Sequence, residues 1–134
     1  KYYMIDIMAA ICLEQMKKLP ANLEFRRHVQ ERYNEELCNL IERPPHSETV
    51  QYYCPRVPSE HRDKLIDYLA SKRIHTSVHF KPLYKYSPVK QNRTYPVCES
   101  EWVKLISLPV HNRMKEEDID YVLYWVNRYF EENL

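Results

Sequence analysis

The sequence contains no glycine among its 134 residues, although an average protein of this size would have about nine. The loops that cradle phosphate groups in P-loop proteins and in dinucleotide-binding folds depend on glycine at fixed positions. The Gly-x-Ser-x-Gly turn that carries the nucleophile of many serine hydrolases depends on it as well. These three classes of functional site are therefore excluded.

A surplus of charge and a long apolar run are also missing. Lys and Arg together number 20 and Asp and Glu number 19, so the formal net charge is +1. Composition therefore offers no electrostatic argument for nucleic acid or anionic lipid as a partner. No stretch approaches the ~20 apolar residues that a membrane-spanning helix needs. We expect a single domain-sized unit that binds neither nucleic acid nor membrane.

Cysteine is present without the paired spacing of most metal or redox sites. No Cys-x-x-Cys motif occurs, and we interpret the cysteines as reduced core residues of an intracellular protein, which indicates a cytoplasmic location. A zinc site built from cysteine with His79 or His111 is a weaker alternative, and we expect no metal site. The four cysteines are Cys12, Cys38, Cys54 and Cys98.

The first third of the chain has a helical pattern. Residues 4–19 are apolar nearly all round, which is typical of a helix covered on several sides and indicates contact with a missing domain or a second subunit. Pro20 is expected to kink this helix or to restart it as a second one. The second helix is amphipathic and is predicted from apolar residues that recur every four positions, at Phe25, Val29, Tyr33, Leu37 and Ile41.

Pro44 and Pro45 are expected to end this helical region. We therefore predict a long helical segment over residues 1–43 and a small domain over residues 44–134. Because the chain enters directly into an apolar helix pattern, we expect it to be a piece of a longer protein.

The remaining sequence alternates short strand patterns with helices. Strands are predicted over residues 50–57, 74–81 and 106–110, and helices are predicted to open near Ser59, Pro96 and Glu116. This order predicts an α/β fold, a two-layer α+β sandwich in which a small three-stranded sheet is covered by helices.

The second predicted strand holds the most promising chemistry. Its apolar face consists of Ile74, Thr76, Val78 and Phe80, and its polar face of His75, Ser77, His79 and Lys81. A histidine at the end of such a strand, next to a lysine, is a candidate functional residue. From the pattern alone, a structural or surface role for His79 is the more common outcome. We interpret His111 as a turn residue.

Four blocks of sequence, taken in order, resemble those of the DegT-type nucleotide-sugar aminotransferases. The second block reads Val-His-Phe-Lys-Pro-Leu and is similar to the Val-His-(Tyr/Phe)-x-Pro-Leu of that family. The third combines Tyr-Pro-Val-Cys-Glu with Ile-Ser-Leu-Pro, and the fourth reads Met-Lys-Glu-Glu-Asp-Ile. The blocks lie at residues 1–19, 78–83, 95–99 with 106–110, and 114–119.

The resemblance implies the C-terminal small domain of a fold-type-I pyridoxal-phosphate enzyme. Such an enzyme transfers an amino group, usually from glutamate, to a keto-sugar carried on a nucleotide, for a surface polysaccharide or a modified sugar. It works as a homodimer in which pyridoxal phosphate is the electron sink. The resemblance places the Schiff-base lysine upstream, in the large domain. We therefore expect this chain alone to bind no cofactor, to contain no catalytic residue and to be inactive.

The resemblance also assigns roles to three residues. Lys1 matches a position that reaches the cofactor of the neighbouring subunit. His79 and Tyr84 match positions that line the sugar-nucleotide pocket. Two alternatives stay open: a stand-alone, non-catalytic interaction module, and a family member that has lost transamination.

The chain departs from the family pattern at two turns that affect folding. Arg73, Ile74 and His75 replace a turn that usually contains glycine, just before the second strand. Lys115 stands where a Ser or Thr usually caps the last helix, so we expect that side-chain cap to be lost.

Overall fold

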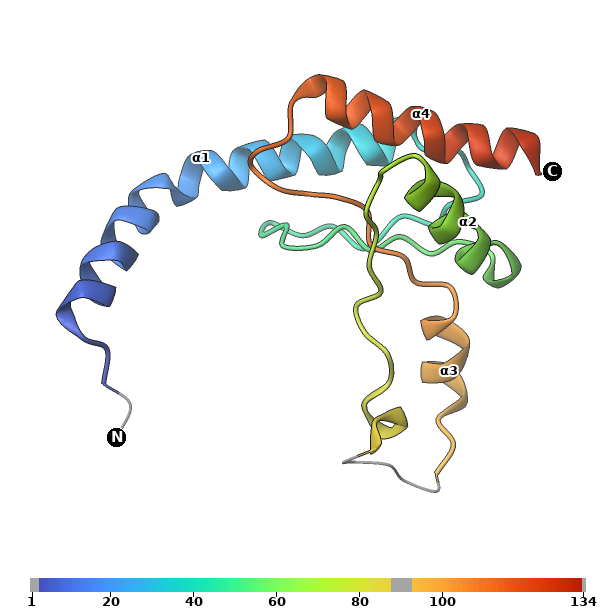
Figure 1. Cartoon of the computed structure of the whole chain (residues 1–134), viewed down its shortest axis with the longest axis horizontal. Helices are drawn as coiled ribbons and strands as arrows, with labels where there is room; N and C mark the ends of the chain where they lie inside the picture. The colour runs from blue at the N-terminus through green and yellow to red at the C-terminus, as the bar shows by residue number, and fades with distance from the viewer. Residues whose placement is uncertain (1–2, 88–92, 134) are drawn as a thin grey trace.

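The structure is a computed structural model that describes residues 3–87 and 93–133. One long helix, α1, runs along a second long helix, α4, and α2 lies beside them (Figure 1). The segment after α2 and the short helix α3 form an extension that projects from the same body (Figure 1). The helices are α1 (Asp6–Glu36), α2 (Ser59–Ser71), the 3-10 helix η1 (Leu83–Lys85), α3 (Pro96–Trp102) and α4 (Glu116–Glu132).

Helix α1 is one uninterrupted helix of 31 residues that contains Pro20. Of the two outcomes expected at Pro20, the restart is wrong and the kink stays a prediction. The helix continues although proline removes one hydrogen bond and usually costs about 3 kcal/mol in a helix interior. The second half of the helix carries Val29 and Tyr33 into the core. This packing supplies a reason for the helix to persist beyond the proline.

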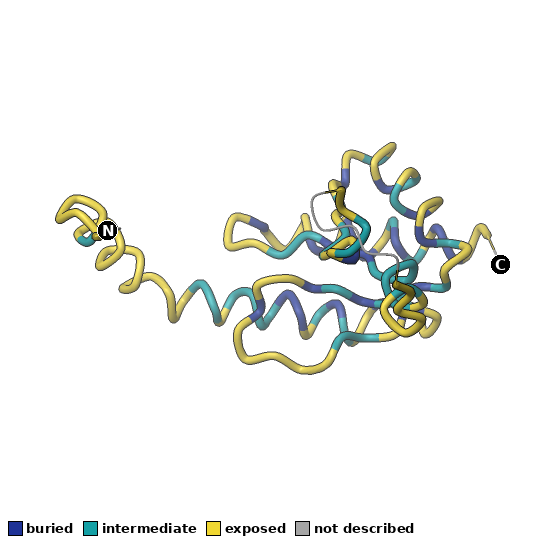
Figure 2. The backbone as a smooth tube through the Cα atoms, turned by 90° about the horizontal axis from the view of Figure 1, so that it is seen from below, coloured by how far each residue is buried: buried dark blue, intermediate teal, exposed yellow. Residues whose placement is uncertain are grey.

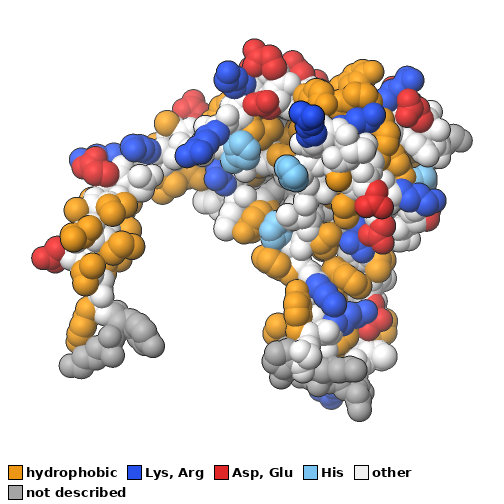
Figure 3. Space-filling model, viewed as in Figure 1, with side chains coloured by type: hydrophobic (Ala, Val, Ile, Leu, Met, Phe, Trp, Pro, Cys, Tyr) orange, Lys and Arg blue, Asp and Glu red, His pale blue; other side chains and the backbone are white. Residues whose placement is uncertain are grey.

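Residues 3–19, called the α1 arm below, project away from the body of the molecule (Figure 2). Hydrophobic side chains cover the arm in the space-filling view (Figure 3). The predicted helix is confirmed here, and its apolar residues are exposed. None of the described helices is long and apolar enough to cross a membrane. The exposed apolar residues of the arm include Met4, Ile5, Ile7, Met8, Ile11, Leu13 and Met16.

The core lies between the second half of α1, α2 and α4. Leu65 and Leu69 of α2 are fully buried, and α4 buries the six apolar residues that the 3.6-residue period predicted. Leu37 and Ile41 belong to the same core. They follow α1, which ends at Glu36, so the prediction that the helix continues to Pro44 and Pro45 is wrong. The boundary between residues 43 and 44 stays a prediction. The buried residues of α4 are Ile119, Val122, Leu123, Val126, Tyr129 and Phe130.

A pair of tyrosines lies at the centre of this core. The rings of Tyr33 and Tyr53 are 5.1 Å apart between centroids, and both side chains are fully buried. Tyr33 Oη donates to the carbonyl of Pro109 over 2.9 Å, and Tyr53 Oη donates to Asn34 Oδ1 over 2.8 Å. Both hydroxyl groups are thus satisfied, as buried polar groups usually are.

The three predicted strand segments lie side by side but do not form continuous strands. Within residues 3–87 and 93–133 they pair through isolated antiparallel bridges, so the predicted three-stranded sheet is not confirmed. Pro55 and Pro109 have no N–H to donate, which interrupts a regular ladder. The segment around residues 105–108 lies between the other two. The bridges are Tyr53–Leu108, Arg56–Leu105, Ser77–Ser107 and Glu42–Arg56.

Asn127 of α4 joins the last helix to the end of α1. Its Nδ2 donates to the carbonyl of Glu36 over 2.8 Å, and its Oδ1 accepts from the backbone N–H of Cys38 over 2.9 Å. Arg43 supports the same helix end, since its guanidinium donates to the carbonyls of Asn34 over 3.2 Å and Cys38 over 2.8 Å. The bonds to Asn34 and Glu36 satisfy carbonyl groups that a helix C-terminus leaves open, and the bonds to Cys38 hold the chain directly after the helix.

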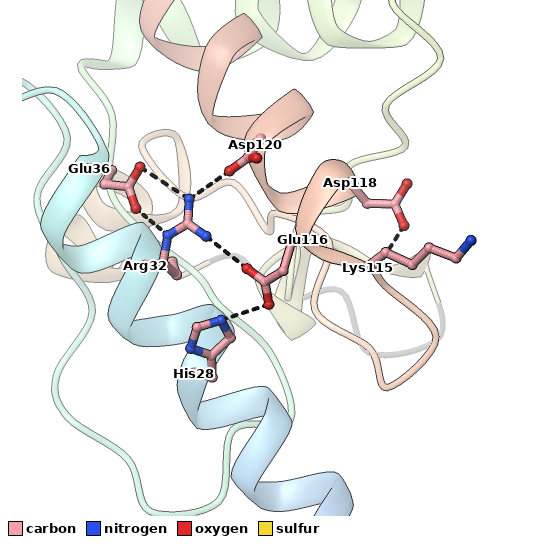
Figure 4. Close-up of polar contacts among 7 residues, drawn as sticks. All are labelled: His28, Arg32, Glu36, Lys115, Glu116, Asp118 and Asp120. Carbon is pink, nitrogen blue, oxygen red and sulfur yellow. Dashed lines mark hydrogen bonds and ion pairs between the residues drawn. The ribbon is translucent and has the colours of Figure 1, made fainter.

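A charged cluster joins the middle of α1 to the start of α4 (Figure 4). Arg32 Nη1 donates to Glu116 over 2.8 Å, and Nη2 donates to Asp120 over 2.6 Å. Arg32 also bonds Glu36, one turn along α1, and His28 Nε2 lies 2.9 Å from Glu116 Oε1. Hydrogen bonds to Glu36 and Asp120 raise the pKa of the Arg32 guanidinium, so Arg32 stays charged.

Two turns show how the chain manages without glycine and without a Ser or Thr cap. Arg73 has a positive φ of 60°, and the N–H groups of Arg73 and Ile74 bond the carbonyls of Ala70 and Leu69, a Schellman ending of α2. At α4 the Lys115 ammonium cannot accept a hydrogen bond. Instead, Asp118 Oδ2 accepts from the backbone N–H of Lys115 over 2.9 Å (Figure 4).

The four cysteines are free thiols, but the expectation that they belong to the core is wrong for two of them. Cys12 and Cys98 are exposed, and Cys38 and Cys54 are half-buried. Cys12 lies on the α1 arm, and Cys98 lies on α3, which contributes no buried residue. The apolar neighbours that suggested burial are themselves exposed on these two elements.

Candidate functional site

Ser107 is a buried polar residue inside an apolar run. It lies between Ile106 and Leu108, which are both buried, and its own exposed fraction is 5%. Its backbone is fixed by a reciprocal pair of bonds with Ser77, of 2.7 Å and 3.2 Å. A buried hydroxyl needs hydrogen-bonding partners. Ser107 Oγ finds two, His79 Nδ1 at 2.7 Å and Cys54 Sγ at 3.1 Å.

The His79 ring is held from a second direction. It stacks on Tyr52 with 4.0 Å between ring centroids and 25° between ring planes. Phe80 meets the same ring edge-on at 4.7 Å. The stack fixes the plane of the imidazole, and the bond to Ser107 fixes its rotation within that plane. His79 is therefore oriented by its surroundings.

His79 and Ser107 line a cavity of about 320 Å³, called the His79 cavity below. Arg26 of α1 lies in its wall, and Nη1 of Arg26 donates to the carbonyls of Val50 and Gln51 over 3.1 Å and 3.4 Å. Histidine side chains gather on this face, near the space between the α1 arm and the α3 extension (Figure 3). The polar side chains that line the cavity belong to Arg26, Gln51, Tyr52, His75, Ser77, His79 and Ser107.

Hydrogen-bond donors dominate this wall. Arginine, glutamine, serine and histidine side chains can all donate, and arginine is always charged. Among the described residues, neither a carboxylate nor a lysine lines the cavity. The wall therefore suits a ligand rich in acceptor oxygens, such as a carboxylate or a phosphate ester.

The predicted polar face of the second strand is confirmed for three of its four residues. His75, Ser77 and His79 all line the His79 cavity. Lys81 is not among the lining residues, and its ammonium group lies 5.6 Å from the centroid of the Tyr86 ring. The predicted apolar face is wrong at Phe80, whose side chain is 67% exposed, because the chain here leaves the core for the extension.

Tyr84 lies elsewhere in the structure. It belongs to η1 and does not line the His79 cavity. Its hydroxyl donates to Glu99 Oε1 of α3 over 2.6 Å, and its ring lies 4.8 Å from that of Tyr95. Burial and the bond to Glu99 raise the pKa of Tyr84, and the same bond lowers the pKa of Glu99. Its predicted role in substrate binding stays a prediction, and Lys1 lies outside the described residues.

A second hollow of about 400 Å³ adjoins the first and shares His75 and Pro109 with it. His111 lines it and closes a turn, since its Nδ1 accepts from the backbone N–H of Arg113 over 3.3 Å. The prediction that His111 is a turn residue is confirmed. Across residues 3–87 and 93–133, no group of three His, Cys, Asp or Glu side chains could hold a metal ion.

Sequence reasoning missed Arg26, Tyr52 and Ser107 as members of the site. Arg26 falls on the polar face of the amphipathic pattern, where a charged residue is usually solvated. The one available signal was Ser107, a hydroxyl in the centre of an apolar run of strand-forming residues. Its partner could not be inferred, because His79 lies 28 positions away in the sequence.

Comparison with known proteins gives a consistent result. The family model of the DegT/DnrJ/EryC1/StrS aminotransferases matches residues 1–127. The uncharacterized protein MJ1066 of Methanocaldococcus jannaschii is 31% identical over an alignment 148 residues long. The alignment covers 99% of this chain and 38% of that protein.

Solved structures share the fold. Spr1654 of Streptococcus pneumoniae, assigned as a sugar aminotransferase and solved in a PLP form, superposes with a TM-score of 0.87 at 28% identity, over 98% of this chain and 37% of that chain. PseC of Helicobacter pylori, an aminotransferase involved in pseudoaminic acid biosynthesis, gives a TM-score of 0.87 at 20% identity, over 98% and 38%. The chain thus spans less than two fifths of the length of these relatives.

Proposed function

Because this chain belongs to the DegT/DnrJ/EryC1/StrS aminotransferase family, we propose that it is the C-terminal part of a PLP-dependent sugar aminotransferase. The family match over residues 1–127 carries this proposal, and it agrees with the resemblance in the four sequence blocks. In such an enzyme this chain would contribute a wall of the substrate pocket.

The substrate class that we propose is a keto-sugar linked to a nucleotide, with glutamate as amino donor. Arg26, His75 and His79 support this choice, because their donors face a cavity that suits phosphate and carboxylate oxygens. A carboxylate donor and a nucleotide diphosphate both present such oxygens. Tyr84, near the tip of the extension, is proposed as a further contact to the same substrate.

The cofactor requires groups that the described residues do not bring to this cavity. Pyridoxal phosphate is held as a Schiff base with a lysine and through an acidic or basic partner of its ring nitrogen, and it supplies the electron sink for amino transfer. Neither a lysine nor a carboxylate lines the His79 cavity within the described residues. We therefore propose that other parts of the parent enzyme anchor the cofactor, with Lys1 reaching it from the neighbouring subunit.

The proposal that other parts of the parent enzyme anchor the cofactor can be tested by absorbance spectroscopy. The chain mixed with equimolar pyridoxal phosphate should develop no internal-aldimine band. A stoichiometric band that disappears when a single lysine of this chain is replaced would contradict the proposal.

Substrate binding can be tested on the chain itself. Titration of the isotope-labelled chain with a nucleoside diphosphate hexose should shift the NMR signals of Arg26, His75 and His79. His79→Ala should abolish the shifts of Arg26 and His75, whereas His46→Ala, at an exposed position outside the cavity, should leave all three shifts unchanged. Shifts confined to other surfaces, or equal effects of both variants, would refute this placement of the substrate.

The α1 arm supports a second part of the proposal, that the parent is a homodimer whose large domain and second copy cover this face. Large apolar side chains such as Ile7 and Met16 are 71% and 65% exposed, and contiguous apolar surface of this kind marks an interaction site. Sedimentation at high concentration should show self-association of the chain, and Ile7→Glu should reduce it. A strictly monomeric profile would contradict this.

A stand-alone interaction module is the competing function, and the same exposed arm favours it. The coding sequence upstream of Lys1 separates the two proposals. A large domain with a Schiff-base lysine supports the enzyme, and a start codon close to Lys1 supports the module.

A further inference from the structure

We propose that Ser107 is a positioning residue that holds neutral His79 as the Nε2–H tautomer. In that form the imidazole presents a hydrogen-bond donor to a ligand. The tautomer follows from contacts within this chain alone, whereas its consequence for the ligand rests on the proposed function.

The number of hydrogens in the cluster decides the tautomer. The Ser107 hydroxyl has one hydrogen and two neighbours, His79 Nδ1 at 2.7 Å and Cys54 Sγ at 3.1 Å. An unprotonated imidazole nitrogen is a strong acceptor, whereas a thiol sulfur is a weak one. The hydroxyl therefore donates to Nδ1, and the Cys54 thiol can donate in turn to Ser107 Oγ.

The reverse order is less favourable. If Nδ1 carried the hydrogen, it would donate to Ser107 Oγ, and the hydroxyl would have only the sulfur of Cys54 as acceptor. The Ser107 hydroxyl would then donate to the weak acceptor Cys54 Sγ in place of the strong acceptor His79 Nδ1, although Ser107 is only 5% exposed. A poorly satisfied group is costly there.

The surroundings prevent the cluster from rearranging. Ser107 is fixed through both backbone bonds to Ser77, and the stack on Tyr52 holds the imidazole plane. The hydroxyl thus meets Nδ1 in one geometry. Nε2 has no hydrogen-bonding partner in the part of the chain that the structure describes, so its hydrogen is left for a ligand.

This tautomer restricts what His79 can do. A neutral imidazole with hydrogen on Nε2 donates to a keto, phosphate or carboxylate oxygen, and it cannot accept a proton through that atom. Together with Arg26 in the same wall, His79 would select a ligand that presents acceptor oxygens on this side. His79 then binds and orients the substrate and does not act there as a general base.

Two-bond proton–nitrogen NMR spectra of the labelled chain, recorded well above the titration range of histidine, read the tautomer directly. The chain offers two internal references. His111 Nδ1 accepts from a backbone N–H and must carry its own hydrogen on Nε2, whereas His75 lines the same cavity without a hydrogen bond to its ring nitrogens among the described residues. We expect His79 to show the pattern of His111 and to differ from the mixture shown by His75.

Variants separate positioning from general structural support. In Ser107→Ala the Nδ1–H fraction of His79 should rise about fivefold, the factor expected for one hydrogen bond of ordinary strength. Ser107→Thr should restore the native pattern, and Cys54→Ala should keep it, because the hydroxyl still donates to Nδ1. Should Ser107→Ala fail to fold, the native spectrum and Cys54→Ala still decide.

An Nδ1–H form in the native chain, or a native mixture equal to that of His75, would overturn the proposal. An unchanged tautomer ratio in folded Ser107→Ala would do the same. The proposed function would survive any of these results, because nucleoside diphosphate hexose binding at His79 is measured separately in the native chain.

Discussion

The buried pair of Tyr33 and Tyr53 should make the fold sensitive to alkaline pH. Burial raises the pKa of Tyr53 to about 12, and burial also raises the pKa of Tyr33. A group whose pKa is raised on folding stabilises the protein fully below its unfolded pKa, near 10 for tyrosine, and this contribution is lost as the pH rises toward the folded pKa. The native state should therefore weaken above about pH 10.

The magnitude follows from the difference between the two pKa values of Tyr53. A folded pKa of about 12 against an ordinary value of 10.0 corresponds to about 2.7 kcal/mol of stability in the neutral range. About 1.4 kcal/mol of it should be lost by about pH 11. Tyr33 acts in the same direction. Small domains are stable by about 5–15 kcal/mol, so the loss is a large share of the total.

Urea unfolding near pH 8 and near pH 11, followed by circular dichroism, measures this loss. Tyr53→Phe keeps the ring but removes the ionisable hydroxyl and its bond to Asn34, so it should be less stable than the native chain near pH 8. Its disadvantage should shrink by about 1.4 kcal/mol near pH 11. Tyr124→Phe, at an exposed tyrosine, is the matched control. A disadvantage of Tyr53→Phe that is equal at both pH values would refute the reasoning.

Three further variants test the turns and contacts that hold α1, α2 and α4. Arg73→Gly should raise the free energy of unfolding by about 1 kcal/mol, because glycine adopts a positive φ without the Cβ penalty; Arg73→Ala keeps the Cβ and should show no such gain in a urea titration. Asn127→Ala should lower the free energy of unfolding by about 1–3 kcal/mol, because two backbone groups at the end of α1 lose their partner. An unchanged urea midpoint would contradict this. Arg32→Ala should lower the free energy of unfolding by about 1 kcal/mol at low salt and by less at about 1 M salt, because the charged cluster around Arg32 is partly exposed and salt screens it. An equal loss at both salt concentrations would show that charge is not the cause.

The helices could be predicted from the sequence because their signals are local. The six core residues of α4 follow a 3.6-residue period, and three acidic residues in its first turn complement the helix dipole. The restart expected at Pro20 is wrong, since α1 runs from Asp6 to Glu36 without interruption, whereas the kink stays a prediction. The half of α1 after Pro20 buries Val29 and Tyr33 in the core, a tertiary contact that a local proline rule does not take into account.

The candidate site could be predicted only in part. Alternation along one strand placed His75, Ser77 and His79 on one face, and the structure brings all three to one cavity. Arg26 and Ser107 come from segments that are distant in the sequence, and no periodic pattern connects such positions. The short strand segments were overestimated as a sheet, because sequence patterns report strand preference and not the length of a ladder.

The contacts between α1 and α4 have a consequence for the order in which the chain folds. Asn127 and Glu116 bond residues of α1 that lie 84 to 91 positions earlier in the sequence. Contacts of such separation are slow to form, because the ends of a long loop must first meet. During synthesis, Val29 and Tyr33 cannot reach their final environment until α4 has left the ribosome. Over that interval the apolar side of α1 is exposed to chaperones, and premature termination before α4 should yield a chain prone to aggregation.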